Sequence, residues 1–398
     1  MFKEESIWIK KALRKIRFKG ETAWYQRILN KHSSNQWPTV LDLGSGTLKY
    51  RKLQQPFIEK NVFSPLIKRG FKIIHADSKK DEGVDLVLDI TKDKIKQSFD
   101  LVLCNSLLEH VTNRDEVARN IINAVKPGGY LLVSVPYDFP YHEDPIDTMY
   151  RPTNKELEKL FPNQEIIDSL ILSCSKGKIS IVLARKPLSL TQLANKYESD
   201  KGDSYMDRHN YSSIYDKYFQ KIRHEKINIL EIGLCRKDGR KQDDCPSLKM
   251  WHDYFLKANI FGFDIADFSF FKQERTKIFQ GDQGDRGDLL KLAKEVGPEF
   301  DIIIDDGSHA SHHQQISLAV LFEFLKPGGL YIIEDLHWQP PEIESMANTI
   351  KTLDFLKSFV KNRAMKSPII TPRETKYLNE NISKCRVYGE KLAIIIKN

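Results

Sequence analysis

Four carboxylates follow two apolar segments in the second half of the sequence. Asp305 and Asp306 end one segment, and Glu334 and Asp335 end the next. In a parallel sheet the carboxyl ends of neighbouring strands lie at one edge, so we expect these side chains to converge. Clustered carboxylates repel one another unless a cation or protons neutralise them. Hard oxygen ligands suit Mg²⁺, Ca²⁺ or Mn²⁺, so the pattern predicts a divalent cation, with His309 placed to take a proton from a coordinated hydroxyl.

Two of these carboxylates also fit a structural role. Asp305 or Asp306 stands where a side chain caps the helix that we expect to follow, because a carboxylate there accepts hydrogen bonds from the first turn. His312 and His313 lie on that helix, and we expect both to be solvated and not to bind the cation.

A glycine turn in the first half points to a bound small molecule. The run Asp42-Leu43-Gly44-Ser45-Gly46 follows a strand-like segment, and its glycines let a ligand approach the backbone closely. An NAD-dependent oxidoreductase would need a complete GxGxxG turn, whereas position 49 is Lys. The turn therefore indicates a ligand without predicting a dinucleotide.

Segment 136–151 carries another candidate for proton transfer. His142 is a candidate general base, because imidazole titrates near working pH and the segment is expected over the carboxyl ends of the strands. His110 is the second candidate, and a substrate-covering loop in which neither histidine acts is the third. Arg151 is expected to pair with Asp147 and not with substrate.

These residues are positioned by a pattern of strands and helices that occurs twice. Short apolar segments alternate with amphipathic helical stretches in both halves, and each half closes with a pair of strand-like segments, within 167–185 and 384–397. This alternation predicts an α/β fold with two Rossmann-like domains, each a mostly parallel sheet with helices on both faces. We expect the domains to be 1–187 and 188–398, divided beside Pro187.

Composition limits the classes of partner. The chain has 398 residues and a net charge of +8, but its basic residues are spread widely and no nucleic-acid motif accompanies them, so we expect no nucleic acid. No apolar run or secretory signal is visible, which predicts a cytoplasmic protein. Segment 7–18 predicts a basic amphipathic helix, which either packs on the sheet or contacts the inner face of a membrane. Assembly into a homo-oligomer is left open.

Residues 38–185 resemble the class I methyltransferases, which use S-adenosylmethionine. The resemblance rests on the glycine turn, on Ile73-Ile74-His75-Ala76-Asp77 and on Leu108-Glu109-His110-Val111. It implies a set of cofactor-binding residues: Asp42, Gly44 and Gly46 for the methionine part, Asp77 for the ribose hydroxyls, Asp89 beside the adenine, and Asn105 after the fourth strand.

Residues 190–340 resemble a narrower family, the macrolide and rhamnosyl O-methyltransferases of antibiotic pathways. The segments that carry this resemblance are Asp200-Lys201-Gly202, Gly262-Phe263-Asp264, Ile304-Asp305-Asp306-Gly307-Ser308-His309 and Glu334-Asp335. The resemblance implies a set of roles: Asp306, Glu334 and Asp335 as metal ligands, His309 as base, Glu231, Gly233 and Asp264 around the cofactor, and Asp282 near its adenine. After Gly233 the usual second glycine is missing and a charged insertion follows.

Together these observations predict a bifunctional S-adenosylmethionine-dependent O-methyltransferase, with Mg²⁺ or a similar cation in the second domain. The expected acceptor is a sugar or glycan, such as rhamnose or another deoxyhexose of a surface polysaccharide or glycoside. The alternative is one catalytic domain whose degenerate partner serves as a scaffold or glycan-binding module.

Overall fold

A computed structural model describes residues 20–30, 38–54, 59–143, 146–174, 177–205, 209–234, 245–297 and 299–398. The chain divides into two compact units, Met1–Leu188 and Ser189–Asn398, where the sequence analysis placed the division after residue 187. The predicted helix at 7–18 and the charged insertion after Leu234 lie outside the described residues.

The first unit is built on a seven-stranded sheet with the order β3-β2-β1-β4-β5-β7-β6. All neighbouring strands are parallel except β7, which runs antiparallel to both β5 and β6. The strands are β1 (Thr39–Leu43), β2 (Lys72–Asp77), β3 (Leu86–Val87), β4 (Phe99–Asn105), β5 (Val125–Asp138), β6 (Glu165–Cys174) and β7 (Gly177–Arg185).

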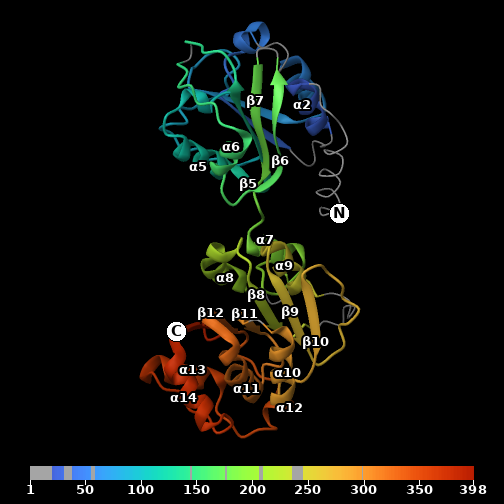
Figure 1. The fold of residues 1–398 in the computed structure, drawn as a ribbon, viewed down its shortest axis with the longest axis vertical. Coiled ribbons are helices and arrows are strands. Elements are labelled where there is room, and N and C mark those ends of the chain that lie inside the picture. The colour runs from blue at the N-terminus through green and yellow to red at the C-terminus, as the bar shows by residue number, and fades with distance from the viewer. Residues whose placement is uncertain are drawn as a thin grey trace. The chain divides into compact units, whose positions relative to one another are not determined.

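Helices cover both faces of this sheet, because its central strands are apolar on both sides. On β4, Val102 belongs to the core that includes α5 (Arg114–Ala124) and α6 (Asn154–Lys159). Leu101, which points to the other face, packs in the core that includes α2 (Glu21–Asn30) and α4 (Ser64–Lys68). Figure 1 shows α2 on the side of the sheet opposite α5 and α6.

The second unit repeats this topology with the strand order β10-β9-β8-β11-β12-β14-β13. Only β14 runs antiparallel to its neighbours. The strands are β8 (Asn228–Ile232), β9 (Asn259–Asp264), β10 (Thr276–Gln280), β11 (Phe300–Asp305), β12 (Leu325–Ile333), β13 (Ile382–Tyr388) and β14 (Leu392–Lys397). The predicted α/β fold of two mostly parallel sheets is therefore confirmed, including the strand pair that closes each unit.

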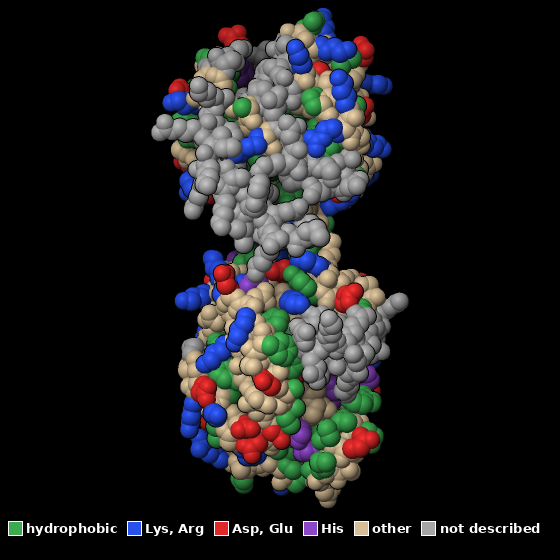
Figure 2. All heavy atoms as spheres, turned by 90° about the vertical axis from the view of Figure 1, so that its right-hand side faces the viewer, with side chains coloured by type: hydrophobic (Ala, Val, Ile, Leu, Met, Phe, Trp, Pro, Cys, Tyr) green, Lys and Arg blue, Asp and Glu red, His purple; other side chains and the backbone are tan. Residues whose placement is uncertain are grey.

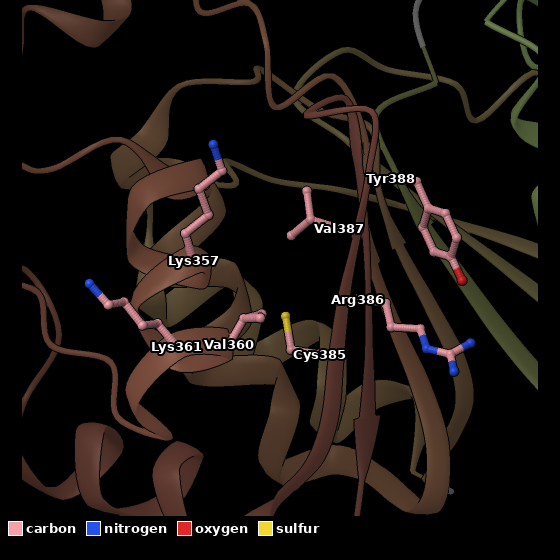
Figure 3. Close-up of a pocket in the computed structure, with 7 residues that line it drawn as sticks. All are labelled: Lys357, Val360, Lys361, Cys385, Arg386, Val387 and Tyr388. Carbon is pink, nitrogen blue, oxygen red and sulfur yellow. The ribbon is translucent and has the colours of Figure 1, made fainter.

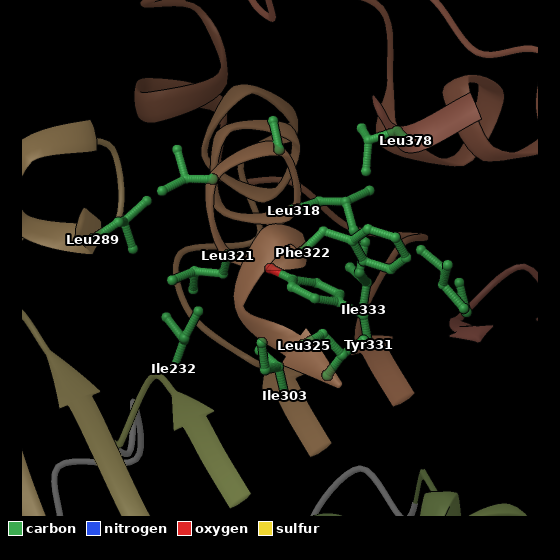
Figure 4. Packing of buried hydrophobic residues seen from close by; sticks show 14 of the residues in the cluster. Ile232, Leu289, Ile303, Leu318, Leu321, Phe322, Leu325, Tyr331, Ile333 and Leu378 are labelled. Carbon is green, nitrogen blue, oxygen red and sulfur yellow. The ribbon is translucent and has the colours of Figure 1, made fainter. Parts of the chain in front are cut away.

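Helices also cover both faces of the second sheet. One core joins Ile303 and Tyr331 of the sheet to Leu318 of α11, as Figure 4 shows. On the other face, Phe219 of α8 packs edge-to-face on Trp251 of α9, with ring centroids 5.9 Å apart. The helices of this unit are α7 (Leu190–Lys196), α8 (Tyr211–Phe219), α9 (Pro246–Tyr254), α10 (Arg286–Val296), α11 (Ser311–Leu321), α12 (Pro341–Glu344), α13 (Thr352–Asn362) and α14 (Pro372–Asn381).

The described surface carries charges of both signs. On the face drawn in Figure 2, Lys and Arg side chains are interspersed with Asp and Glu. The excess positive charge of +8 therefore does not form one basic patch on that face. Among the residues that the structure describes, no helix is long and apolar enough to cross a bilayer.

Candidate active sites

Parallel register brings the acidic residues of the second unit to one edge of the sheet. Asp305 lies level with Ile232 on one side and with Ile333 on the other. The residues that follow or flank these positions, Asp306, Glu334 and Glu231, therefore emerge side by side. The convergence expected from the sequence is present.

A lysine occupies the centre of this acidic group. The side chain of Lys201, only 1% exposed, places Nζ 3.1 Å from Glu334 Oε2 and 3.5 Å from Glu231 Oε1. It also donates to the carboxylate of Asp306. Burial lowers the pKa of this ammonium group, but the surrounding carboxylates outweigh burial and hold the pKa well above its usual value. Lys201 is thus a buried counter-ion of the cluster.

The sequence analysis gave Lys201 no role. The residue stands in the Asp200-Lys201-Gly202 segment that carries the family resemblance, and this is the only sequence signal that pointed to it. The segment follows α7, far from β11 and β12 in the chain. Pattern and spacing alone therefore do not place its side chain among their carboxylates.

Asp335 and His309 form the outer part of the cluster. The Tyr211 hydroxyl donates to Asp335 Oδ1 at 2.6 Å, and His309 Nε2 lies 3.9 Å from Asp335 Oδ2. Although burial opposes ionisation, the Tyr211 hydroxyl and the nearby histidines hold the pKa of Asp335 below its usual value. Both His309 and Asp335 have left-handed backbone, with φ of +60° and +52°, a conformation that costs free energy in a non-glycine residue and is concentrated at functional sites.

The capping role considered for Asp305 and Asp306 is wrong. The residue that precedes the first turn of α11 is Ala310, and the first N–H of the helix, that of Ser311, donates to Glu344 Oε2 at 2.7 Å. Asp305 is fully buried and accepts a 2.6 Å hydrogen bond from Gln283 Nε2. Burial raises its pKa to about 7. Solvation of the two helix histidines is also wrong, because His312 is buried and His313 is half-buried with Nδ1 2.7 Å from Ser308 Oγ.

The turn after β8 is tightly packed against the acidic cluster. Gly233 has φ of +89°, and a Cβ there would stand 2.1 Å from the backbone oxygen of Asp306. Asp264 at the end of β9 accepts a 2.6 Å hydrogen bond from the backbone N–H of Leu234. Asp282, beyond β10, accepts one from the N–H of Gly284 at 2.7 Å. The predicted cofactor residues of this unit thus lie at successive strand ends.

The corresponding turn of the first unit has the same construction. Gly44 and Gly46 have φ of +73° and +65°. Asp77 at the end of β2 accepts a 2.9 Å hydrogen bond from the N–H of Gly46. The buried Asp42 lies 2.9 Å from His75 Nδ1. These contacts fix the turn that the sequence predicted to hold the methionine part of a cofactor.

Two further predicted residues of the first unit differ in their surroundings. Asn105, at the end of β4, accepts hydrogen bonds from the hydroxyls of Tyr25 and Ser134. Asp89 follows β3 and bonds within its own turn, where Thr91 Oγ1 donates to it at 2.6 Å. The Asp89 carboxylate is thereby oriented by local contacts, and its position beside an adenine stays a prediction.

The candidate bases of the first unit lie together. The ring centroids of His110 and His142 are 5.1 Å apart, and His142 Nε2 lies 3.8 Å from Asp147 Oδ2. Arg151 pairs with Asp147, as predicted. Glu109 is buried beside the two histidines, and burial raises its pKa to about 8. Which of these groups moves a proton stays a prediction.

Comparison with known proteins agrees with this geometry. Residues 13–166 match a family model described as a methyltransferase domain. Both units have the class I methyltransferase fold.

Sugar O-methyltransferases are among the relatives of this chain, which confirms the resemblance expected from the sequence. Mycinamicin VI 2''-O-methyltransferase of Micromonospora griseorubida is 32% identical over 261 residues, covering 61% of this chain and 63% of that protein. The 8-demethyl-8-(2-methoxy-alpha-L-rhamnosyl)-tetracenomycin-C 3'-O-methyltransferase of Streptomyces olivaceus is 39% identical over 153 residues, covering 38% of this chain and 37% of that protein. The chain therefore spans less than two thirds of the length of these relatives.

One solved structure adds a description of a similar protein. It is that of the MycE methyltransferase from the mycinamycin biosynthetic pathway in complex with Mg and SAH, and it is 32% identical to this chain. The match covers 53% of this chain and 55% of that chain, with a TM-score of 0.43.

The carboxylates of the second unit have the donor chemistry of a divalent cation site. One ligand atom each of Asp306, His309 and Asp335 lies within 4.8 Å of the others. Burial, with the neighbouring carboxylates, raises the pKa of Asp306, and burial raises that of Glu334 to about 8. A single lysine therefore does not neutralise the group, and a bound divalent cation would relieve the repulsion that remains.

Figure 3 shows a surface hollow of the second unit. It is lined by residues of α13 and β13, including Lys361, Cys385 and Tyr388. None of the predicted site residues lines it, so we assign it no part in the chemistry below.

Proposed function

We propose that the chain is an S-adenosylmethionine-dependent O-methyltransferase that methylates hydroxyl groups of a sugar. The observation that carries this proposal is the meeting of Asp306, Glu334, Asp335 and His309 beside the Gly233 turn, with register-matched strands β8, β11 and β12 as their support. The named activities of the relatives, which are methyl transfers to sugar oxygens, support the acceptor class.

In the proposed reaction the acceptor oxygen attacks the sulfonium methyl group in line. The bond from carbon to oxygen forms while the bond from carbon to sulfur breaks, and sulfur leaves as a neutral thioether. The hydroxyl proton passes to His309, whose ring is held between Asp335 and the Trp338 ring, 5.7 Å away by centroids. A positioned base of this kind contributes typically about 10²–10⁴-fold in rate.

The residues of the second unit divide the remaining tasks. Glu231, buried under the cofactor turn and bonded to Trp251 Nε1 at 3.2 Å, is placed to accept a hydrogen bond from the cofactor. Asp306, Glu334 and Asp335 would hold a Mg²⁺-like cation. When bound, such a cation lowers the pKa of a coordinated hydroxyl and stabilises negative charge on its oxygen. Lys201 keeps the carboxylates of Asp306 and Glu334 in place.

We further propose that the first unit methylates the same class of acceptor, so that the chain is bifunctional. Its glycine turn, with Gly46 tied to Asp77, supports cofactor binding. A surface polysaccharide or a glycoside is the proposed carrier of the sugar.

Activity and chelation test the proposal. The full chain is incubated with S-adenosylmethionine carrying a labelled methyl group and a panel of rhamnosides and other deoxyhexosides, and products are read by mass spectrometry. We expect a methylated sugar as product. A chelator should strongly reduce methyl transfer by the second unit, and added Mg²⁺ should restore it. Asp335→Asn should mimic chelation. If neither the chelator nor Asp335→Asn changed methyl transfer, the metal-assisted site would be contradicted.

A further inference from the structure

A second group of metal-binding side chains lies in the first unit, apart from the carboxylates discussed above. Glu109 and His110 belong to the short helix η3 (Leu108–His110) that follows β4, and His142 follows β5. Since β4 and β5 are parallel neighbours, their ends bring these residues together. One ligand atom from each lies within 4.8 Å of the others.

Hydrogen bonds from the Ser106 side chain and from a backbone N–H favour the ionised form of the buried Glu109 carboxylate, but one of its oxygens has no partner. The residue is 1% exposed, and its Oε2 accepts no hydrogen bond from the described part of the chain. Oε1 lies 3.8 Å from His110 Nε2, which is beyond hydrogen-bond distance. An unpaired polar atom at this depth is costly, and a cation between Glu109 and the imidazoles would satisfy it.

His110 is oriented as a metal ligand. Its Nδ1 lies 3.0 Å from the carbonyl oxygen of Ile146, and a carbonyl only accepts, so Nδ1 carries the proton. Nε2 is then the unprotonated nitrogen, and it faces Glu109. Metal-binding histidines commonly have this arrangement, with the second nitrogen donating to a backbone carbonyl or carboxylate.

Asp147 and Arg151 lie next to His142, outside the proposed ligands. Asp147 lies beside the His142 ring and has its negative charge balanced by Arg151. The Arg151 guanidinium, tied to Asp147 by two nitrogens, fixes the carboxylate in position. Asp147 lies 3.8 Å from His142 Nε2, and because Arg151 balances its charge it adds no unpaired charge to the site.

We propose that Glu109, His110 and His142 bind a divalent transition-metal ion of the Zn²⁺ or Co²⁺ type. Two imidazoles with one carboxylate are a ligand set that such ions favour, with remaining positions open to water or a ligand oxygen. Bonds of about 2.0–2.2 Å require the three side chains to close on the ion by small rotations. The site differs in chemistry from the oxygen-rich group around Asp306.

Cobalt titration of the full chain tests the site. The metal-free protein is titrated with Co²⁺ in excess Mg²⁺, which occupies the oxygen-rich site, while visible d–d absorption is recorded. We expect saturable bands, displaced by Zn²⁺. Glu109→Gln and His142→Gln should each weaken Co²⁺ binding by roughly tenfold or more. Removing a residue that only hydrogen-bonds to a metal ligand already weakens metal affinity by about that factor.

Two matched variants act as controls. Glu143→Gln changes an exposed acid next to His142, and Asp335→Asn changes the second unit; both should bind Co²⁺ as the parent does. We also expect added Zn²⁺ to raise the melting temperature of the parent and to raise that of His142→Gln by less. His142 is only half-buried, so we expect this variant to keep the core intact. Absence of the bands, their survival in Glu109→Gln and His142→Gln, or their loss in Asp335→Asn would overturn the proposal.

Discussion

Lys201 shows how one buried residue holds an acidic cluster together. Its ammonium group lies among Asp306, Glu334 and Glu231, three carboxylates that would otherwise share a poorly solvated space. Removing one partner from a buried ionic group leaves an uncompensated charge, which is strongly destabilising. The lysine therefore stabilises the site, and a divalent cation can take over part of its role.

Lys201→Met keeps the bulk of the side chain and removes its charge. We expect the free energy of unfolding to fall by about 3–5 kcal/mol in the presence of a chelator. Added Mg²⁺ should recover part of this loss, because the cation neutralises the same carboxylates. Urea unfolding of variant and parent, each with chelator and with Mg²⁺, measures both effects. A loss below about 1 kcal/mol, or one that Mg²⁺ leaves unchanged, would contradict this role.

His309→Ala tests the proposed base directly. We expect kcat for transfer by the second unit to fall by about 10²–10⁴-fold, with affinity for S-adenosylmethionine retained, since the role proposed for His309 is to take the acceptor's proton and not to bind the cofactor. His313→Ala is the matched control on α11, where the ring bonds Ser308, and its kcat should stay close to that of the parent. Equal losses in both variants would point to a structural effect on the helix.

At the scale of elements, the loops after β8 and β11 are packed so closely that only glycine fits at position 233. A methyl group there would collide with the Asp306 backbone. Gly233→Ala should therefore push apart the cofactor turn and the metal-binding loop together. Gly328, at the start of β12, also has positive φ, but a Cβ there meets nothing within 4 Å.

We expect Gly328→Ala to cost about 1–2 kcal/mol of unfolding free energy, the price of left-handed backbone alone. Gly233→Ala should cost more and should also weaken the binding of both S-adenosylmethionine and Mg²⁺ to the second unit. Thermal unfolding and calorimetry compare the two variants. Equal stability and unchanged binding in Gly233→Ala would show that the two loops are not in contact.

The elements were the most predictable part of the molecule. Strands such as 101–103 and 302–304 are continuously apolar, and alternation with helices implies a parallel sheet, so the acidic residues at strand ends were expected to meet. The side of the sheet to which the Asp305 side chain points was not predictable. Successive residues of a strand point to opposite sides, and tertiary contacts decide the side for the last residue of the strand. Asp305 turns to Gln283, whereas Asp306 turns to Lys201.

Residues brought in by distant segments could not be predicted from pattern. Lys201 reaches β11 and β12 from the turn after α7, and Tyr211 reaches Asp335 from α8. Both contacts depend on how α7 and α8 pack over the carboxyl ends of the strands. Local periodicity carries no information on that packing.

At the scale of the whole molecule, two copies of one topology stand on one chain, and the central claim is that each binds S-adenosylmethionine. The first copy presents Asp42 under its glycine turn, and the second presents Glu231 at the same place on β8. Both side chains are buried, so the conservative changes Asp42→Asn and Glu231→Gln remove a charge without removing volume.

Calorimetric titration of the full chain with S-adenosylmethionine, in the parent and in these two variants, tests this claim most directly. Circular dichroism should first establish that both variants fold as the parent does. We predict two binding sites in the parent, one weakened or lost in Asp42→Asn and the other in Glu231→Gln. A single site in the parent, lost in only one of the variants, would contradict the claim for the other unit, and no binding at all would contradict it for both.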